Sequence, residues 1–361
     1  MRLNVYYTQD DPKILTGIDF VDRRRYVIRA MVPPGYESYF QEQARHASAH
    51  TSTAIEGNPL NEEAAMQVLA EGVGVDSPAA IEKLNLDEAY ELMSLLSEDK
   101  STKIDEGVIR TMNSVILRNL PDYEARGRGK YRLGQNQVVD SVTHEVRYRP
   151  PPPEWVPELM VGFVQDVDRW MAECPGPVAA ALAHFALISI HPFDNGNGRT
   201  ARLLADMVLD LKGWSIQGML SITNVILDRH EDYYNTLREA QGDDYLETVD
   251  ATPFVRFHTE VIAAAAVRME EKVVIFNKSR DALRSRLPFL NERQVTGLMF
   301  MLDVGPLSTS VYARLTRSSQ ATALADLIAL VTDSVVVRTG AGRNTRYGLN
   351  PEVTKGVEAA Q

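Results

Sequence analysis

Apolar and polar residues along this chain follow mainly a helical spacing. Apolar positions recur every three or four residues in segments 78–96 and 104–117, which favours amphipathic helices. Segment 36–55 lacks glycine and proline and stops at EGNP (56–59), where glycine followed by proline signals a helix end. A further helix is predicted after Asn61, its candidate cap. Other segments with helical character are 155–172, 178–190, 199–211, 224–240 and 253–276.

The pattern changes twice. Residues 137–148 hold two short runs around the polar SVTH, and four prolines follow, which predicts a β-hairpin. Beyond 279 the sequence predicts helices near 291–303, 308–316 and 319–331, then a strand, a glycine-rich turn and a strand. We therefore expect a mainly α fold with four parts: an N-terminal helical region (1–100), a core (101–278), a third domain (279–350) and a tail (351–361).

Composition agrees with a globular protein. The 361 residues are 44% hydrophobic and 24% charged, and their number suits two or three domains. The single cysteine, Cys174, excludes an intrachain disulfide and fits a cytoplasmic location. The N-terminus has no apolar core of signal-peptide length, and the longest nearly apolar run, 177–190, is too short to span a bilayer. We expect a cytoplasmic protein with no membrane partner.

Charge is distributed unevenly. The net charge of −11 disfavours non-specific nucleic-acid binding by the whole molecule. Segment 280–361 has ten Lys or Arg and seven Asp or Glu, or about +3, which leaves about −14 for the remainder. A sign difference of this kind often accompanies a change of domain role.

A polar loop interrupts the most apolar part of the chain. Segments 178–190 and 199–211 predict two central helices, and HPFDNGNG (191–198) joins them. Gly196 and Gly198 let backbone N–H groups turn toward an anion beside a helix N-terminus. Arg199 and Arg202, three residues apart, share a helix face and can both contact phosphate oxygens. His191 is the group in this loop that can accept a proton near pH 7. The loop therefore predicts a polyphosphate site.

The array His191-Pro192-Phe193, two residues, Gly196-Asn197-Gly198-Arg199, two residues and Arg202 resembles the signature of the Fic family. The resemblance implies a helical Fic fold and a protein adenylyltransferase, which transfers AMP from ATP to a Ser, Thr or Tyr hydroxyl of a target protein and of itself. It implies that His191 is the catalytic base. Gly196, Asn197, Gly198, Arg199 and Arg202 would bind the nucleotide, and Phe193 would anchor the loop. Glycine at 198 favours nucleotidyl transfer, because the related phosphotransferases carry lysine there.

One position departs from that signature. Most AMP-transferring members carry Asp or Glu directly before Gly-Asn-Gly, where it binds Mg²⁺, but this chain has Asn195. An amide oxygen can coordinate Mg²⁺ without balancing its charge, so Asn195 is a weak candidate ligand. The acid lies one residue earlier, at Asp194, where it can instead cap a turn.

A second motif agrees with the first. STAIEG (52–57) fits the family's inhibitory pattern of Ser or Thr, three residues, Glu, then Gly or Asn. The resemblance implies that Glu56 pairs with Arg202 in place of the γ-phosphate and that Ser52 orients Glu56. A carboxylate competes well with phosphate for one guanidinium.

Other segments resemble family features. The hairpin 137–148 corresponds to a flap that aligns the target protein by strand-to-strand hydrogen bonds. Tyr233 and Tyr234, in DYYNTL, resemble the tyrosines of the adenine pocket, although core packing would also explain them. His184, on an apolar helix, is expected to be a hydrogen-bonded core residue.

Segment 279–350 resembles a winged helix-turn-helix domain, a common partner of this Fic class. Its arginines and the start of the helix near 319 would face a nucleic acid, although many winged helices bind only proteins. DNA and protein both remain candidate partners, and the sequence is compatible with a homodimer without fixing the oligomeric state.

Three functional hypotheses follow. The favoured one is an autoinhibited protein adenylyltransferase that uses ATP and Mg²⁺. In the second, Asn195 marks a weak catalyst, and the chain is a nucleotide-binding winged-helix transcriptional regulator. In the third, Glu56 positions a water that removes AMP from a modified protein.

Overall fold

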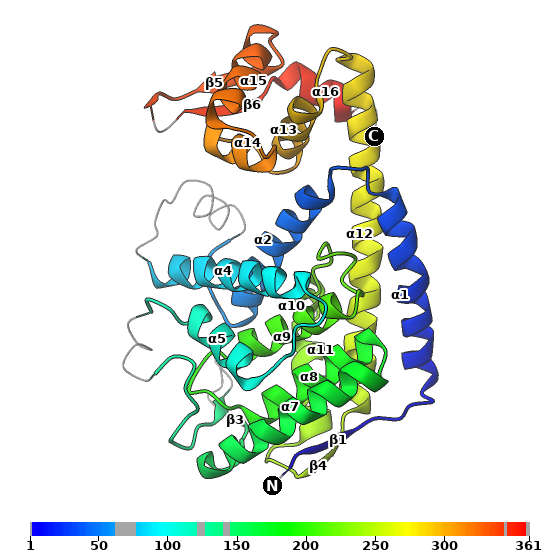
Figure 1. Cartoon of the computed structure of the whole chain (residues 1–361), viewed down its shortest axis with the longest axis vertical. Coiled ribbons are helices and arrows are strands. Elements are labelled where there is room, and N and C mark those ends of the chain that lie inside the picture. The colour runs from blue at the N-terminus through cyan, green and yellow to red at the C-terminus, as the bar shows by residue number, and fades with distance from the viewer. Residues whose placement is uncertain (1, 62–76, 121–126, 140–144, 343–344, 359–361) are drawn as a thin grey trace. The chain divides into compact units, whose positions relative to one another are not determined.

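Helices make up most of the computed structural model of the chain, which describes residues 2–61, 77–120, 127–139, 145–342 and 345–358 (Figure 1). The chain divides into two units, one formed by Met1–Arg29 and Gln41–Val267, the other by Ala30–Phe40 and Arg268–Gln361. The predicted mainly α fold is confirmed. In the described ranges, the structure holds no helix with the length and apolarity that a membrane span requires.

Two helices form the centre of the first unit. Every residue of α8 (Gly176–Ile190) is buried, and so is all of α9 (Asn197–Leu211) except Gly198. Alanines dominate α8, and this lets neighbouring helices approach closely. α7 (Val156–Glu173) packs on α8, while α4 (Pro78–Glu98) and α5 (Glu106–Ile116) pack on α9 (Figure 1). The two apolar segments of the sequence therefore hold the polar loop between them.

Several predicted helices have shifted or divided ends. α2 (Glu37–Ile55) ends at the predicted glycine turn, and α12 (Thr252–Arg286) continues ten residues beyond the predicted end, through a stretch without glycine or proline. The prediction of one continuous helix at 224–240 is wrong. The segment forms two helices, α10 (Thr223–Asp228) and α11 (His230–Gln241), because Arg229 leaves helical geometry at φ −110°, ψ 35°.

The sequence analysis did not predict three features of the fold. α1 (Pro12–Met31) buries Ile14, Val21 and Ile28, a narrow apolar seam that repeats every seven residues. β1 (Asn4–Tyr6) and β4 (Thr248–Asp250) form a parallel pair, with Val5 opposite Val249. A 3₁₀ turn, Pro153–Trp155, precedes α7.

The hairpin near 137–148 is present as a short antiparallel pair. β2 (Val138–Val139) pairs with β3 (Val146–Tyr148), with Val138 opposite Tyr148. The SVTH segment between them and the helix predicted after Asn61 lie outside the described residues.

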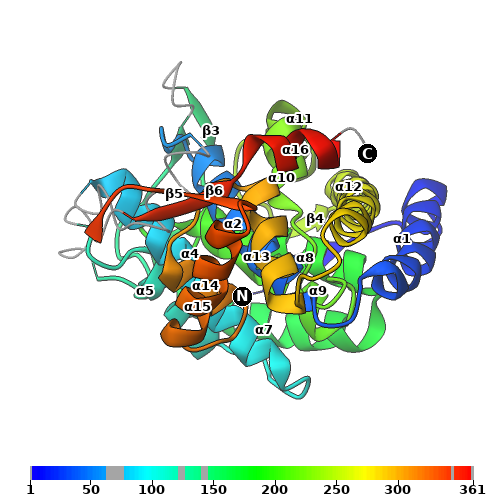
Figure 2. The ribbon, with the colours of Figure 1, turned by 90° about the horizontal axis from the view of Figure 1, so that it is seen from above.

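The second unit contains α13 (Glu292–Asp303), α14 (Thr309–Leu315), α15 (Gln320–Thr332) and α16 (Pro351–Glu358). A capping box at Asn291 begins α13, and the hydroxyls of Ser308 and Ser319 cap the next two helices. β5 (Val336–Thr339) and β6 (Arg346–Leu349) lie side by side as an antiparallel pair (Figure 2). The order of three helices and a hairpin follows the sequence prediction, and α16 occupies the expected tail.

Candidate active site

The loop between α8 and α9 turns sharply at both ends. His191 ends α8 in the left-handed conformation (φ 51°, ψ 58°), and its N–H still donates to the carbonyl oxygen of Leu187 at 2.9 Å. Gly196 is left-handed too (φ 75°) and is the residue from which α9 begins. A left-handed backbone conformation is costly for a residue with a side chain. The surrounding structure must therefore hold His191 in this conformation.

The half-buried His191 imidazole is uncharged at neutral pH. Burial is the main cause that lowers the pKa of His191 to about 4; the positive charge of Arg132 acts in the same direction, while the Ile188 carbonyl and Glu56 oppose the shift. Nδ1 lies 3.4 Å from the carbonyl oxygen of Ile188. A proton on Nδ1 leaves Nε2 as the acceptor, so the ring can take a proton from a ligand.

Phe193 and Asn197 fix the shape of the loop. The Phe193 ring is buried and lies 5.8 Å from the Tyr131 ring. Asn197 Oδ1 accepts from the Phe193 N–H (3.0 Å), and Asn197 Nδ2 donates to the Phe193 carbonyl oxygen (2.8 Å). Asn197 was expected to contact phosphate, but its amide contacts the loop backbone in this structure.

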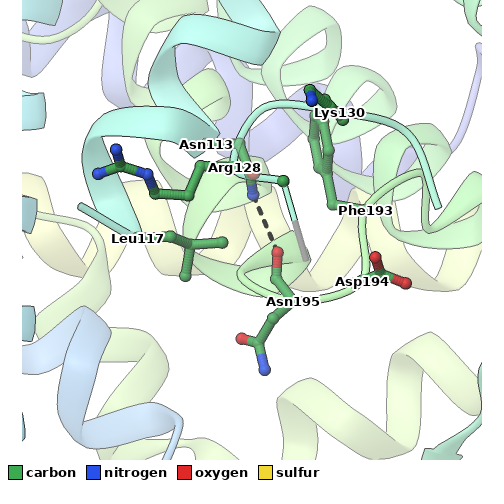
Figure 3. Close-up of a pocket in the computed structure, with 8 residues that line it drawn as sticks. Asn113, Leu117, Arg128, Lys130, Phe193, Asp194 and Asn195 are labelled. Carbon is green, nitrogen blue, oxygen red and sulfur yellow. Dashed lines mark hydrogen bonds between the residues drawn. The ribbon is translucent and has the colours of Figure 1, made fainter. Parts of the chain in front are cut away.

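Two residues that the sequence analysis did not assign to the site also hold the loop. Buried Asn113, on α5, donates from Nδ2 to the Asn195 carbonyl oxygen (2.9 Å) and accepts from the Gly129 N–H (3.1 Å). Figure 3 shows it beside a small pocket next to the loop, with Lys130 and Asp194 among the lining residues. Buried Arg132 donates from Nε to the His191 carbonyl oxygen (2.9 Å). A polar Asn113 among the apolar positions of α5 was the available sequence signal.

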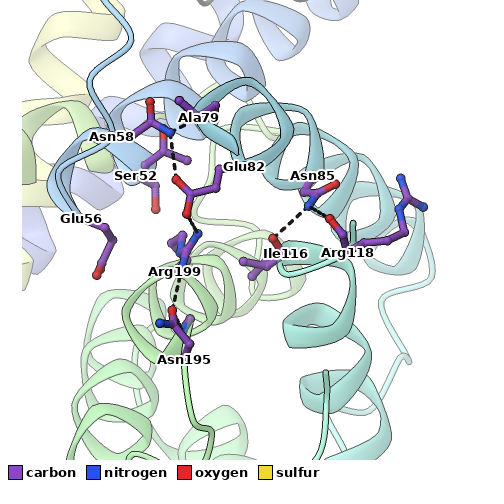
Figure 4. A network of polar contacts seen from close by, with 12 residues as sticks. Ser52, Glu56, Asn58, Ala79, Glu82, Asn85, Ile116, Arg118, Asn195 and Arg199 are labelled. Carbon is purple, nitrogen blue, oxygen red and sulfur yellow. Dashed lines mark hydrogen bonds and ion pairs between the residues drawn. The ribbon is translucent and has the colours of Figure 1, made fainter. Parts of the chain in front are cut away.

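Arg202 is completely buried and contacts the end of α2. Its Nε donates to Ser52 Oγ (2.9 Å), and its Nη2 donates to the Ser52 carbonyl oxygen (2.9 Å) and to Glu56 Oε1 (2.7 Å). Figure 4 shows Ser52 and Glu56 on this segment. A Cβ atom at Gly198 would overlap Glu56 Oε1, so glycine lets the carboxylate lie against the start of α9. The Glu56–Arg202 pairing is the one that the sequence analysis expected, whereas Ser52, which was expected to orient Glu56, contacts Arg202.

Glu56 and Arg202 each stabilise the charged form of the other. Burial opposes ionisation of Glu56, but attraction to Arg202 and then to Arg199 lowers the pKa of its carboxyl below the ordinary value. Burial likewise disfavours the charged guanidinium of Arg202, yet attraction to Glu56 raises its pKa. Both groups therefore remain ionised at neutral pH.

Arg199 is also buried but has different partners. Its Nη1 donates to Glu82 Oε1 on α4 (3.0 Å), and its Nη2 donates to Asn195 Oδ1 (3.0 Å) (Figure 4). Within the described ranges, Arg199 Nε and Arg202 Nη1 have no hydrogen-bond partner. Both nitrogens are buried, so each arginine has a donor that its present partners leave unsatisfied.

Asn195 does not fit a magnesium ligand in this conformation. Its Oδ1 already accepts from the N–H of Gly196 (2.6 Å) as well as from Arg199. A guanidinium on the same oxygen repels a divalent cation. Asp194 is exposed, and the described part of the chain contains no group of three or more His, Cys, Asp or Glu that could hold a metal ion.

The two candidate tyrosines occupy different environments. Tyr233 is buried, and its hydroxyl lies 2.9 Å from Nε2 of His184, which is a hydrogen-bonded core residue. Tyr234 is 39% exposed, and its ring stands edge-on to His230, with centroids 4.8 Å apart. Tyr234 is thus accessible to a ligand, whereas Tyr233 supports the core.

Comparison with known proteins agrees with this geometry. Residues 103–209 match the sequence profile of the Fic/DOC family. Protein adenylyltransferase Fic of Nematostella vectensis is 33% identical over 227 residues, which cover 61% of this chain and 46% of that protein. Protein adenylyltransferase fic-1 of Caenorhabditis elegans is 31% identical over 217 residues, covering 58% and 37%. The chain spans less than half the length of these curated relatives.

Solved structures show the same fold. A Fic family protein from Desulfovibrio desulfuricans G20 matches with a TM-score of 0.59 and 24% identity, over 95% of this chain and 98% of that chain. Residues 134–508 of C. elegans Fic-1 match with a TM-score of 0.52 and 23% identity, over 71% and 70%. Residues 103–209 of this chain therefore form a domain that matches the Fic/DOC family.

Proposed function

We propose that this protein is an adenylyltransferase that transfers AMP from ATP to a hydroxyl of a target protein and of itself, and that it is autoinhibited. The observation that carries the proposal is the ion pair between Glu56 and Arg202 against Gly198, in the same loop region as His191. The names of the Nematostella and Caenorhabditis relatives support the reaction class.

The residues would act as follows. Neutral His191 accepts the proton of the incoming hydroxyl at Nε2. The hydroxyl oxygen bonds to the α-phosphorus as the bond from that phosphorus to the β-phosphate breaks, and pyrophosphate leaves. Arg199 and Arg202, with the glycine N–H groups at the start of α9, hold the negative phosphates. Tyr234 lies where its exposed ring can pack against a nucleobase.

Autoinhibition follows because Glu56 occupies a hydrogen-bond donor of Arg202 that a phosphate would need. In this conformation Glu56 takes Arg202 Nη2 and adds a negative charge where phosphate oxygens would bind. ATP must therefore displace Glu56 or bind without that contact, in a pose unsuited to attack.

Labelled ATP tests the proposal. Wild type, Glu56→Gly and Glu56→Gly with His191→Ala are incubated with ATP labelled at the α- or the γ-phosphate. We expect α-label in Glu56→Gly at least tenfold above wild type, no label without His191, and no γ-label. Incorporation of γ-label would indicate phosphotransfer, and α-label that persists without His191 would contradict its role as the base.

The remaining parts would supply partners. The edge of the β2–β3 pair would offer backbone groups to a strand of the target protein. The winged-helix assignment of 279–350 is supported by the order of α13, α14, α15 and the β5–β6 pair. Ser319 and Thr322 hydrogen-bond each other at the start of α15, so DNA contact there would fall to other groups. A salt-dependent mobility shift with DNA, lost in Arg338→Ala, would favour a DNA partner.

A further inference from the structure

The two arginines of the loop motif are each paired with a carboxylate from outside the motif. Arg202 contacts Glu56 at 2.7 Å, and Arg199 contacts Glu82 at 3.0 Å. The Arg199 side chain is 4% exposed and that of Glu82 is 23% exposed. Solvent ions screen the Arg199–Glu82 pair less than a surface pair, so an incoming anion must compete with Glu82 as well as with Glu56.

Glu82 is in turn held by the segment that carries Glu56. Asn58 donates from Nδ2 to Glu82 Oε2 (2.9 Å) and to the Ala79 carbonyl oxygen (3.0 Å) (Figure 4). The Asn58 N–H donates to the Thr53 carbonyl oxygen (3.1 Å), which fixes Asn58 to the last turn of α2. One turn of chain therefore contacts Arg202 directly through Glu56 and Arg199 indirectly through Asn58 and Glu82.

We propose that Glu82 is a second inhibitory carboxylate, which keeps Arg199 from the nucleotide phosphates and is coupled to Glu56 through Asn58. The inference rests on the proposed function in one respect, namely that Arg199 and Arg202 bind phosphate. Displacement of the end of α2 removes Glu56 from Arg202 and, at the same time, removes the Asn58 donor that orients Glu82. Release of Arg202 from Glu56 thereby also weakens the contact of Arg199 with Glu82.

The chemistry of Glu82 distinguishes this role from a purely structural one. Arg199 keeps Asn195 Oδ1 as a partner when Glu82 is absent, so its guanidinium is not left without support. Glu82→Gln keeps the shape and a hydrogen-bonding oxygen but removes the negative charge that opposes phosphate. Glu88, on the same helix, pairs with Arg118 on the exposed surface and provides a matched control.

Calorimetric binding of ATP and AMP tests the proposal without requiring catalysis. Glu82→Gln and Glu88→Gln are compared in the Glu56→Gly protein, with thermal unfolding measured on each variant. We expect Glu82→Gln to tighten ATP binding about tenfold, or about 1.4 kcal/mol, and Glu88→Gln to leave it unchanged. AMP binding should not respond, because AMP lacks the β- and γ-phosphates.

Asn58→Ala tests the coupling. In otherwise wild-type protein it should tighten ATP binding about threefold, whereas in the Glu82→Gln protein it should have no effect, since its path to Arg199 is gone. If Glu82→Gln lowers the unfolding midpoint strongly, Glu82→Asp is used in its place. Aspartate keeps the charge but is too short to reach Arg199 fully, so Glu82→Asp should tighten ATP binding by less than the tenfold expected for Glu82→Gln.

The outcomes separate the two proposals. Equal ATP affinities for Glu82→Gln and Glu88→Gln would show that Glu82 only packs the helix, and weaker ATP binding in Glu82→Gln would show that it orients Arg199 for the nucleotide; both overturn the inference. Tightened ATP binding without any α-label incorporation would uphold the second carboxylate and refute the transferase.

Discussion

Arg132 donates from its Nε to the carbonyl oxygen of His191, 2.9 Å away, and the Arg132 N–H donates to the carbonyl oxygen of Pro192, also at 2.9 Å. Its Nη2 donates to the carbonyl oxygen of Pro151, beyond the hairpin. A buried guanidinium therefore connects the loop between α8 and α9 to both ends of the hairpin segment. It also holds His191 in a left-handed backbone conformation that helical residues do not adopt.

Loss of Arg132 should reduce both stability and activity. Arg132→Met leaves buried carbonyl groups without donors, which should lower the free energy of unfolding by about 2–3 kcal/mol. In the Glu56→Gly protein, α-label incorporation should fall at least tenfold, because the His191 backbone is no longer fixed. Chemical denaturation and labelling at 15 °C measure the two effects, with exposed Lys130→Met as control. Unchanged labelling in a folded Arg132→Met protein would contradict this positioning role.

The pH profile should lack an acid limb near the ordinary histidine pKa. Burial lowers the pKa of His191 to about 4, so the neutral base prevails above that pH. Glu56 raises the pKa of His191, so its removal lowers that pKa further. Labelling by Glu56→Gly protein should therefore stay level from pH 8 down to pH 5. A midpoint near 6.5 would place His191 in a more polar environment than this one.

The same shift has a consequence for stability. Because the folded pKa lies below the unfolded one, the unfolded chain binds the proton first as pH falls. The His191 contribution is fully present above about pH 6.5 and is lost progressively toward pH 4. The unfolding free energy of wild type should thus fall more steeply between pH 6.5 and 5 than that of His191→Ala. Parallel curves for the two proteins would refute this assignment.

The two neighbouring tyrosines should differ in their effect on ATP binding. Tyr233→Phe removes a buried hydroxyl that hydrogen-bonds His184, and should cost about 1 kcal/mol of unfolding free energy. Tyr234→Ala removes a partly exposed ring that also packs on His230, and should weaken ATP binding several-fold with a stability cost of about 1 kcal/mol. Denaturation and ATP calorimetry on both variants check this. Equal ATP affinities for Tyr234→Ala and wild type would remove Tyr234 from the nucleotide site.

The sequence predicted the local elements of this site better than it predicted the distant residues that contact them. The apolar runs of α8 and α9 and the polar loop between them are local patterns, and so is the glycine turn after Glu56. Asn113 and Arg132 contact the loop, and Glu82 contacts Arg199 near the start of α9, each from more than 50 residues away. Periodicity does not reveal which helices pack together. The narrow apolar seam of α1 and the three-residue strands β1 and β4 gave signals too weak to recognise.

An acid in place of Asn195 should change the metal requirement. Asn195→Asp replaces a neutral oxygen by a charged one, which attracts Mg²⁺ more strongly and also pairs with Arg199. In the Glu56→Gly protein we expect Asn195→Asp to lower the Mg²⁺ concentration for half-maximal labelling several-fold. Asn195→Ala serves as the control and should leave it unchanged, because Asn195 Oδ1 already accepts from Gly196 and Arg199. Because a side chain at position 195 affects the titration only if its oxygen lies near the ion, identical titrations for all three proteins would show that the metal contacts only the nucleotide.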